Sequence, residues 1–294
     1  MRAPKSDFDR WTKNGLKGWE FSQVLPYYKK IETADFGDDK WHGRNGPISV
    51  HLLKIDEITN TAKDFVEAAI NTGISFQEDL NIPFPKGVGI YSININRGIR
   101  LNTGISYLAE KVRERPNLNI VGNTTVSKII FDNGSVKGVV LNDGNTIFAK
   151  NIILSCGTIG TGGILLRSGL GPRKQLESLK IPVIADLPVG QFVMDQPQIY
   201  LKVNINGDED SFPPIGGKVW EQSSYAEGDE LDYYLGFNHF ADLSKSPTGK
   251  AFGIIVCGCR PVSRGKLQLD PNDILASPRV SLNLLSKDNE YKLW

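Results

Sequence analysis

The strongest hint of chemistry in the sequence is a glycine-rich segment, residues 157–163, which reads Gly-Thr-Ile-Gly-Thr-Gly-Gly. It follows an apolar run at 151–156 that suits a buried parallel strand, and it precedes a short helix predicted from residue 164. A strand that ends in a glycine-rich turn and opens a helix is typical of dinucleotide-binding sites, because N–H groups at the helix start favour phosphate. The spacing is G-x-x-G-x-G-G, so by itself it also fits an ordinary strand-to-helix turn.

The residues before this segment favour the nucleotide interpretation. Two apolar runs over 119–131 are followed by Asn133-Gly134, a pair that favours a type I′ hairpin turn. A strand over 136–141, a second tight turn and a strand over 146–149 complete a three-stranded antiparallel meander. A meander that returns to a buried strand and a glycine-rich turn is the layout of many flavoproteins with two dinucleotide-binding domains. Flavin binding is therefore favoured.

The other polar residues give weaker evidence of a functional site. His42 lies in a loop rich in glycine, where a structural role is expected, and His239 either faces a pocket or hydrogen-bonds on a strand. Asp195 stands before Gln196-Pro197, where a local turn is the default. Phosphate-binding Walker loops, nucleophile elbows and HExxH motifs are absent from the sequence.

The three cysteines do not form an even disulfide framework. Cys257 and Cys259 are two residues apart in an apolar run, so on a strand both would face the same side. Together with Cys156 they are expected to be buried thiols. With only three histidines in the chain, no metal site is expected.

The composition of the chain bears on which kinds of partner it can bind. The chain has 34 basic and 33 acidic residues, a net charge of +1, which gives no electrostatic reason to expect nucleic acid or an anionic membrane. We find no apolar run of about 18 residues and no apolar signal-peptide core near the start, so neither a transmembrane helix nor a signal peptide is expected. Cellular location and oligomeric state are not indicated.

Further elements follow from periodicity. We expect a helix over 23–31 with Ser22 as its N-cap, and a strand over 48–52. A helix over 61–72 is expected to start at Thr61, and another to span 104–115. Residues 79–89 are expected to form a loop.

A set of motifs, in one order along the chain, resembles the glucose–methanol–choline (GMC) oxidoreductase family. They span nearly the whole chain, and their shared order is more specific than any one of them. The matching residues are Trp11, 15–19, 24–30, 42–43, 46–47, 98–100, 107–108, 115–118, 154–159, 168–172, 187–191, 195–197 and 261–265.

The resemblance implies an FAD-dependent oxidoreductase that acts on the CH–OH group of a small-molecule alcohol. It also implies the cofactor contacts. The backbone of Val126 would meet the adenine, the turn made of Cys156, Gly157, Thr158 and Ile159 would lie near the dinucleotide, and Asp195, Gln196 and Pro197 would lie near the flavin.

The implied fold is α/β plus α+β. Residues 1–190 would form an incomplete FAD-binding domain of the two-dinucleotide-binding type, with lid and intermediate loops over 1–96 and the antiparallel meander with its glycine turn over 97–190. Residues 191–294 would form part of a substrate-binding domain built on an antiparallel sheet.

Two features of the family have no counterpart here. These are the βαβ unit with G-x-G-x-x-G and the segment that carries the catalytic histidine, so no residue of this chain is assigned as catalytic. The sequence therefore predicts an internal fragment of a GMC enzyme that is inactive by itself and binds FAD weakly. A relative of the hydroxynitrile lyases, suggested by 157–161 and 189–192, and a non-catalytic paralogue are the alternatives.

Overall fold

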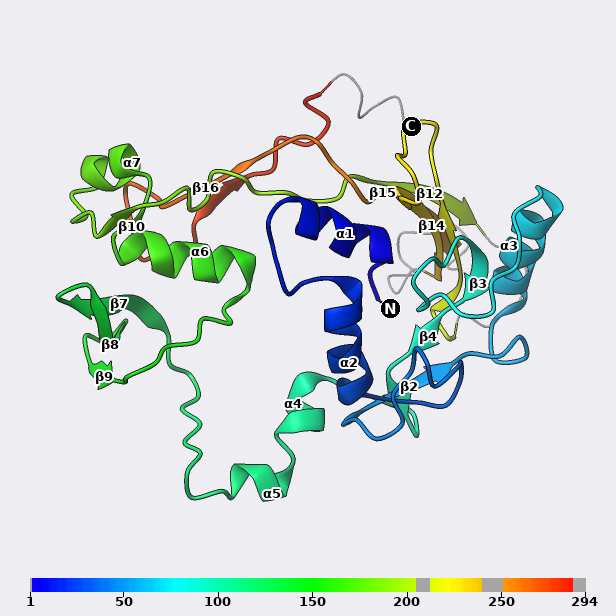
Figure 1. The fold of residues 1–294 in the computed structure, drawn as a ribbon, viewed down its shortest axis with the longest axis horizontal. Helices are drawn as coiled ribbons and strands as arrows, with labels where there is room; N and C mark the ends of the chain where they lie inside the picture. Colours follow the sequence, from blue (N-terminus) through cyan, green and yellow to red (C-terminus); the bar gives the residue numbers. More distant parts are fainter. Residues whose placement is uncertain (1, 205–211, 240–250, 288–294) are drawn as a thin grey trace. The chain divides into compact units, whose positions relative to one another are not determined.

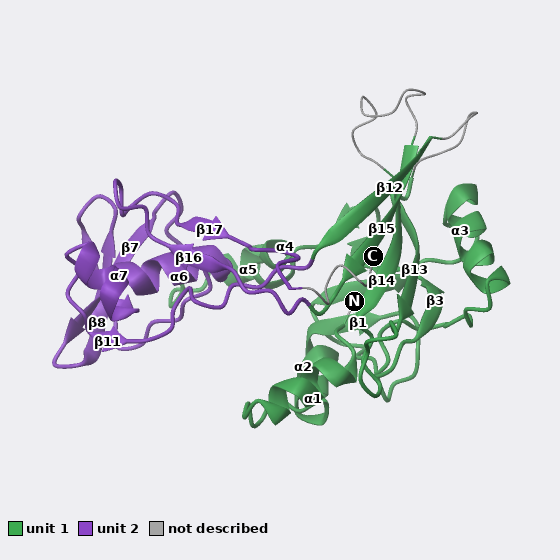
Figure 2. Cartoon of the chain, turned by 90° about the horizontal axis from the view of Figure 1, so that it is seen from above, with its two compact units in different colours: residues 1–118, 197–260, 293 green, residues 119–196, 261–292, 294 purple. Residues whose placement is uncertain are grey.

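The computed structural model describes residues 2–204, 212–239 and 251–287. The chain divides into two compact units (Figure 2). Unit 1 takes the residues up to 118 together with 197–260, and unit 2 takes 119–196 and the residues from 261 onward. The chain thus passes from unit 1 to unit 2 at 118/119, returns to unit 1 at 196/197 and enters unit 2 again at 260/261. This differs from the predicted continuous division at 190/191, because residues near 265 hydrogen-bond back to residues near 190: Leu267 N–H donates to the Gly190 carbonyl at 2.8 Å.

Unit 1 is built on a five-stranded antiparallel sheet with the order β12-β15-β14-β13-β3, and helix α3 lies against one face (Figure 1). Apolar side chains that alternate along the strands meet this helix: Phe237 packs near Ala62, and Val219 packs near Val66. A Cβ on Gly216 would lie 2.3 Å from the Ala62 Cβ, so the close approach of helix and sheet requires glycine there. The elements are α3 (Asn60–Asn71), β3 (Gly87–Ile90), β12 (Gln198–Asn204), β13 (Ile215–Glu221), β14 (Tyr233–His239) and β15 (Ala251–Gly258).

The rest of unit 1 surrounds a smaller mixed sheet with the order β1-β2-β4 and a two-stranded hairpin, β5-β6. Phe8 is buried and makes edge contacts with Trp11, Phe21 and Tyr28, which joins the first two helices. The elements are α1 (Lys5–Lys13), α2 (Phe21–Ile31), β1 (Glu32–Ala34), β2 (Ile48–Leu52), β4 (Ser92–Ile93), β5 (Ile95–Asn96), β6 (Ile99–Arg100), α4 (Thr103–Tyr107) and α5 (Glu110–Arg113).

Unit 2 contains the predicted antiparallel meander, which is confirmed as β7-β8-β9. Asn133 and Gly134 both have left-handed φ values, 49° and 77°, as a type I′ turn requires. The hydrophobic core of unit 2 contains Leu166, Leu176 and Leu267. The elements are β7 (Val126–Asp132), β8 (Ser135–Leu141), β9 (Thr146–Phe148), α6 (Gly157–Arg167), β10 (Leu170–Gly171), α7 (Arg173–Ser178), β11 (Ala185–Asp186), β16 (Lys266–Gln268) and β17 (Arg279–Ser281).

Several predicted boundaries in unit 1 are wrong. Helix α2 begins at Phe21 and carries Pro26 at its sixth residue, so Ser22 is not the N-cap. Helix α3 is capped by Thr59, whose hydroxyl accepts a hydrogen bond from the Ala62 N–H, and not by Thr61. Strand β3 occupies the end of the predicted 79–89 loop. The predicted 104–115 helix is divided into the short helices α4 and α5.

The predicted strand over 151–156 is also wrong. These residues are irregular, and Ile153 is 89% exposed, because no described strand pairs with them. Helix α6 already begins at Gly157, so the glycine-rich segment is helical and not a turn before the helix. Gly157 itself has a φ of +71°, which favours glycine at the helix start.

None of the helices in the described part is both long and apolar enough to cross a bilayer.

Candidate functional site

One end of helix α6 is fixed to the first strand of the meander. The Arg167 Nε donates to the Ser127 carbonyl at 2.7 Å, and the Ile129 N–H donates to the Ser168 Oγ at 2.8 Å. Val126, the predicted adenine contact, is half-buried at the start of β7 and therefore lies near the C-terminal end of α6.

The other predicted nucleotide contacts lie at the opposite end of the helix. Cys156 is the N-cap, and Gly157, Thr158 and Ile159 form the first turn, all of them exposed. Gly157 and Arg167 are ten positions apart along the helix, about 15 Å at 1.5 Å per residue. The first turn carries no acidic side chain, so the N–H groups and the positive end of the helix dipole stay available to an anion. The structure therefore places the predicted contacts at the two ends of one helix.

The three residues predicted near the flavin divide between the units. Asp195 and Gln196 belong to unit 2 and are exposed, and the Asp195 Oδ1 accepts a hydrogen bond from the Gln196 N–H at 2.8 Å. Pro197 belongs to unit 1 and is buried, with its carbonyl accepting from the Gly258 N–H at 3.1 Å.

His42 lies at the centre of a buried charged network in unit 1. Its Nδ1 lies 3.0 Å from Glu32 Oε1, and its Nε2 lies 2.8 Å from Asp79 Oδ2. An ionised carboxylate only accepts hydrogen bonds, so both ring nitrogens carry protons. Arg2 completes the network with its Nη2 at 2.5 Å from Glu32 Oε1. The formal charges, two positive and two negative, cancel.

The pKa values in this network follow from its geometry. Burial lowers the pKa of His42, but hydrogen bonds to Asp79 and Glu32 outweigh burial and raise it above its ordinary value. For Glu32 and Asp79, burial raises the pKa, yet hydrogen bonds from His42 and from backbone N–H groups leave both below their usual range. The structural role expected for His42 accounts for every contact described.

His239, the other histidine considered from the sequence, hydrogen-bonds on a strand. It is buried on β14, and its Nε2 lies 3.0 Å from the Thr59 Oγ1, the N-cap of α3. This links the sheet to the helix that covers it.

A second group of residues with shifted pKa values lies on the five-stranded sheet of unit 1. Lys218 is 1% exposed, and its Nζ lies 3.8 Å from the ring centroids of both Trp220 and Tyr234. Burial lowers the pKa of Lys218 to about 7, against the raising effect of the Cys259 and Cys257 thiols. Cys257 accepts a contact from Gln198 Nε2 at 3.5 Å, and hydrogen bonding to Cys259 lowers its pKa to about 6.

The expectation of three buried cysteines is only partly met. Cys257 is buried and Cys259 is partly buried, but Cys156 is exposed because the segment before it is not part of a sheet. In the described ranges, no group of three or more His, Cys, Asp or Glu side chains is arranged to hold a metal ion.

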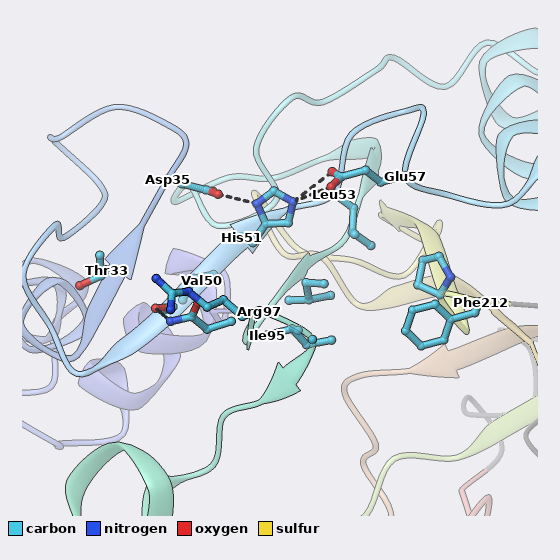
Figure 3. Close-up of a pocket in the computed structure, with 14 residues that line it drawn as sticks. Thr33, Asp35, Val50, His51, Leu53, Glu57, Ile95, Arg97 and Phe212 are labelled. Carbon is cyan, nitrogen blue, oxygen red and sulfur yellow. Dashed lines mark hydrogen bonds and ion pairs between the residues drawn. The ribbon is translucent and has the colours of Figure 1, made fainter. Parts of the chain in front are cut away.

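A pocket that the residue pattern does not predict lies in unit 1 (Figure 3) and has a volume of about 670 Å³. His51, on β2, forms part of its wall between two carboxylates: its Nδ1 hydrogen-bonds Asp35, and its Nε2 lies 3.0 Å from Glu57 Oε2. The hydrogen bond to Asp35 is the main reason that the pKa of His51 is raised. Asp35 and Glu57 lie 16 residues before and 6 residues after His51, too irregular a spacing to predict from periodicity.

Comparison with known proteins finds similarity to one family, the GMC oxidoreductases. The family model of GMC oxidoreductases matches residues 1–198. An uncharacterized GMC-type oxidoreductase of Rhodococcus erythropolis is 31% identical over 294 residues, covering 99% of this chain and 58% of its own length. An oxygen-dependent choline dehydrogenase of Burkholderia multivorans is 35% identical over 229 residues, covering 76% of this chain and 40% of its own length.

Solved structures agree on the fold. Pyridoxine 4-oxidase from Mesorbium loti aligns with a TM-score of 0.84 at 24% identity, over 99% of this chain and 60% of its own. Formate oxidase from Aspergillus oryzae aligns with a TM-score of 0.84 at 21% identity, over 99% of this chain and 62% of its own. The chain therefore spans between 40% and 62% of the length of the proteins compared. Its fold has mixed α/β content and antiparallel sheets, as in the solved structures.

Proposed function

Because the chain belongs to the GMC oxidoreductase family, we propose that it is part of an FAD-dependent oxidoreductase that acts on the CH–OH group of a small alcohol. The observation that carries the proposal is the match of the GMC family model over residues 1–198, in a chain whose curated relatives include choline dehydrogenases. When bound, FAD would supply the hydride acceptor, and the protein would supply orientation and proton transfer.

The geometry of unit 2 supports a place for part of the cofactor. An extended dinucleotide could have its adenine at the Val126 backbone and its pyrophosphate at the first turn of α6, since these two places lie at opposite ends of one helix. The exposed N–H groups of 157–159 fit a phosphate better than a neutral group. Asp195, Gln196 and Pro197 are proposed to lie near the flavin. No described residue is proposed as the catalytic base.

Placing a carboxylate at the first turn of α6 tests the dinucleotide site. We expect the isolated chain to bind FAD weakly, with a Kd above about 1 μM. Thr158→Glu should weaken this binding by about tenfold, because the new carboxylate repels the pyrophosphate. The same charge interacts favourably with the helix dipole, so Tm should stay level or rise. Flavin fluorescence titration and thermal melts measure the two effects.

Thr158→Gln is the matched control, with a side chain of the same length and no charge, and it should bind FAD like the parent. Equal losses of affinity in both variants would point to shape and not charge at this turn. Unchanged affinity in Thr158→Glu would remove α6 from the proposed cofactor site.

Activity assays separate the three candidate functions. The assay uses the longest protein that contains this chain. We expect that protein to reduce a dye, and the reduction to require both FAD and a small alcohol. Cyanohydrin cleavage without dye reduction would favour the relative of hydroxynitrile lyases. A folded protein that shows neither reaction and takes up no FAD would favour the non-catalytic paralogue.

A further inference from the structure

The pocket beside His51 has the size of a small-molecule site. Its volume of about 670 Å³ falls within the range of roughly 300–1,000 Å³ found for ligand pockets. Apolar side chains cover much of its surface: Leu53, Ile93, Ile95 and Phe212 (Figure 3). Such a surface favours the apolar body of a ligand, since burying it removes apolar area from water on both sides.

The carboxylates of the pocket already have partners. Asp35 accepts hydrogen bonds from the His51 ring and from the Leu52 N–H, and Glu57 accepts from the His51 ring and the Lys54 N–H. A protonated His51 between them offsets one of the two negative charges. An incoming ammonium group would therefore have to compete with His51 for both acids.

Arg97 is in the opposite situation. It follows Asn96 in the turn of the β5-β6 hairpin and is among the residues that line the pocket. Its guanidinium makes no hydrogen bond or ion pair with any residue in the part of the chain that the structure describes. A planar guanidinium binds carboxylates in a bidentate manner, and near an apolar surface such a pair is stronger than in open water.

We infer that this pocket binds a small amphipathic carboxylate, with the carboxylate on Arg97 and the apolar body against Ile93, Ile95 and Leu53. All the residues that line the pocket belong to unit 1, whereas all but one of the proposed cofactor contacts belong to unit 2. It needs neither FAD nor an alcohol, so its test is independent of the proposed function. The two acids on the far side of the pocket favour a ligand whose charge is confined to one end.

The test compares three probes of one shape: hexanoate, 1-hexanol and hexylammonium. Isothermal titration and thermal shift on the intact chain, without FAD, should show hexanoate binding at least about tenfold more tightly than either of the others. Tighter binding of hexylammonium would assign the site to Asp35 and Glu57 and overturn the inference. Equal binding of all three probes would show that the pocket takes up apolar chains without regard to charge, which would overturn the inference. The absence of binding by any probe would overturn it as well.

Two exposed arginines of one hairpin give a matched pair of variants. Arg97→Gln should weaken hexanoate binding by at least about tenfold and leave hexanol unchanged. Arg100→Gln removes the same charge from the same hairpin, but Arg100 does not line the pocket, so binding should stay as in the parent. Equal losses in the two variants would show a general charge effect and not a site. Both side chains are exposed, so neither substitution should affect folding.

Discussion

Replacing His42 with leucine is expected to lower the free energy of unfolding by about 3–5 kcal/mol, the usual cost of removing one partner from a buried ionic group. The substitution leaves Glu32 and Asp79 buried: among the described residues, Glu32 keeps its ion pair with Arg2, and Asp79 loses its ion pair with His42. It also removes two hydrogen bonds of 3.0 and 2.8 Å and the contact with the Phe36 ring. Urea unfolding at pH 6.5 measures the change.

His51→Leu is the matched control, because His51 also lies between two carboxylates. Its side chain is 29% exposed, whereas that of His42 is 1% exposed. Water screens the exposed pairs, so the cost at His51 should stay below about 1 kcal/mol. Similar losses at the two positions would show that burial does not govern the strength of these ion pairs.

The two variants also predict a pH dependence. The pKa of folded His42 is raised, so its contribution is fully present below the unfolded value of 6.5 and is lost as the pH rises through the folded pKa. The lowered pKa values of Glu32 and Asp79 have the opposite consequence: their contribution is present above the unfolded values and is lost as the pH falls. The stability difference between parent and His42→Leu should therefore shrink on both sides of a maximum between about pH 5 and 6.5.

Lys218→Met is expected to stabilise the protein, and to do so most at low pH. The pKa of folded Lys218 is about 7 against an ordinary 10.5, so the buried amine must take up a proton at a cost below pH 7. Between pH 7 and 10.5 the unfolded chain holds a proton that the folded chain has released, so the stability of the parent rises with pH. At 1.36 kcal/mol per pKa unit, the rise from pH 7 to 9 is about 2–3 kcal/mol.

Methionine has nearly the same length and apolar character as the lysine stem, so it can fill the space between Trp220 and Tyr234. The stability gain from Lys218→Met should be a few kcal/mol at pH 6 and should shrink by about 2–3 kcal/mol by pH 9. Cys257, with its pKa lowered to about 6, adds a change of the same sign to the parent. Lys202→Met, at an exposed lysine of β12, should leave the pH profile unchanged. A profile of Lys218→Met parallel to that of the parent would contradict the shift.

The features predicted well were those fixed by neighbouring residues. The Asn133-Gly134 pair sets the hairpin turn by its own backbone preference, and the meander followed. Family membership came from motifs that need only their order along the chain. Each of these signals depends on residues close together in the sequence or on their order, so it can be used without knowledge of tertiary contacts.

The features that were missed depend on distant partners. Residues 151–156 have the composition of a buried strand, but a strand exists only when another strand pairs with it. The residues before β3 predict a loop, because the partner of this strand, β13, lies far along the chain: Gly87 pairs with Trp220. The pocket was missed for the same reason, since Asp35, His51 and Arg97 come from three separate segments.

The three crossings between the units have a consequence for the order in which the chain can fold during synthesis. Strand β3 is made early, but β13, to which it pairs, follows only after all of 119–196, and β15, which joins β12 to β14, comes later still. The meander and α6, all made within 126–167, can close first. Of the two units, unit 1 is begun first but is complete only once β15 has been made, and the core of unit 2 in turn waits for Leu267 on β16. Until then the apolar strands of unit 1 depend on being kept from aggregation.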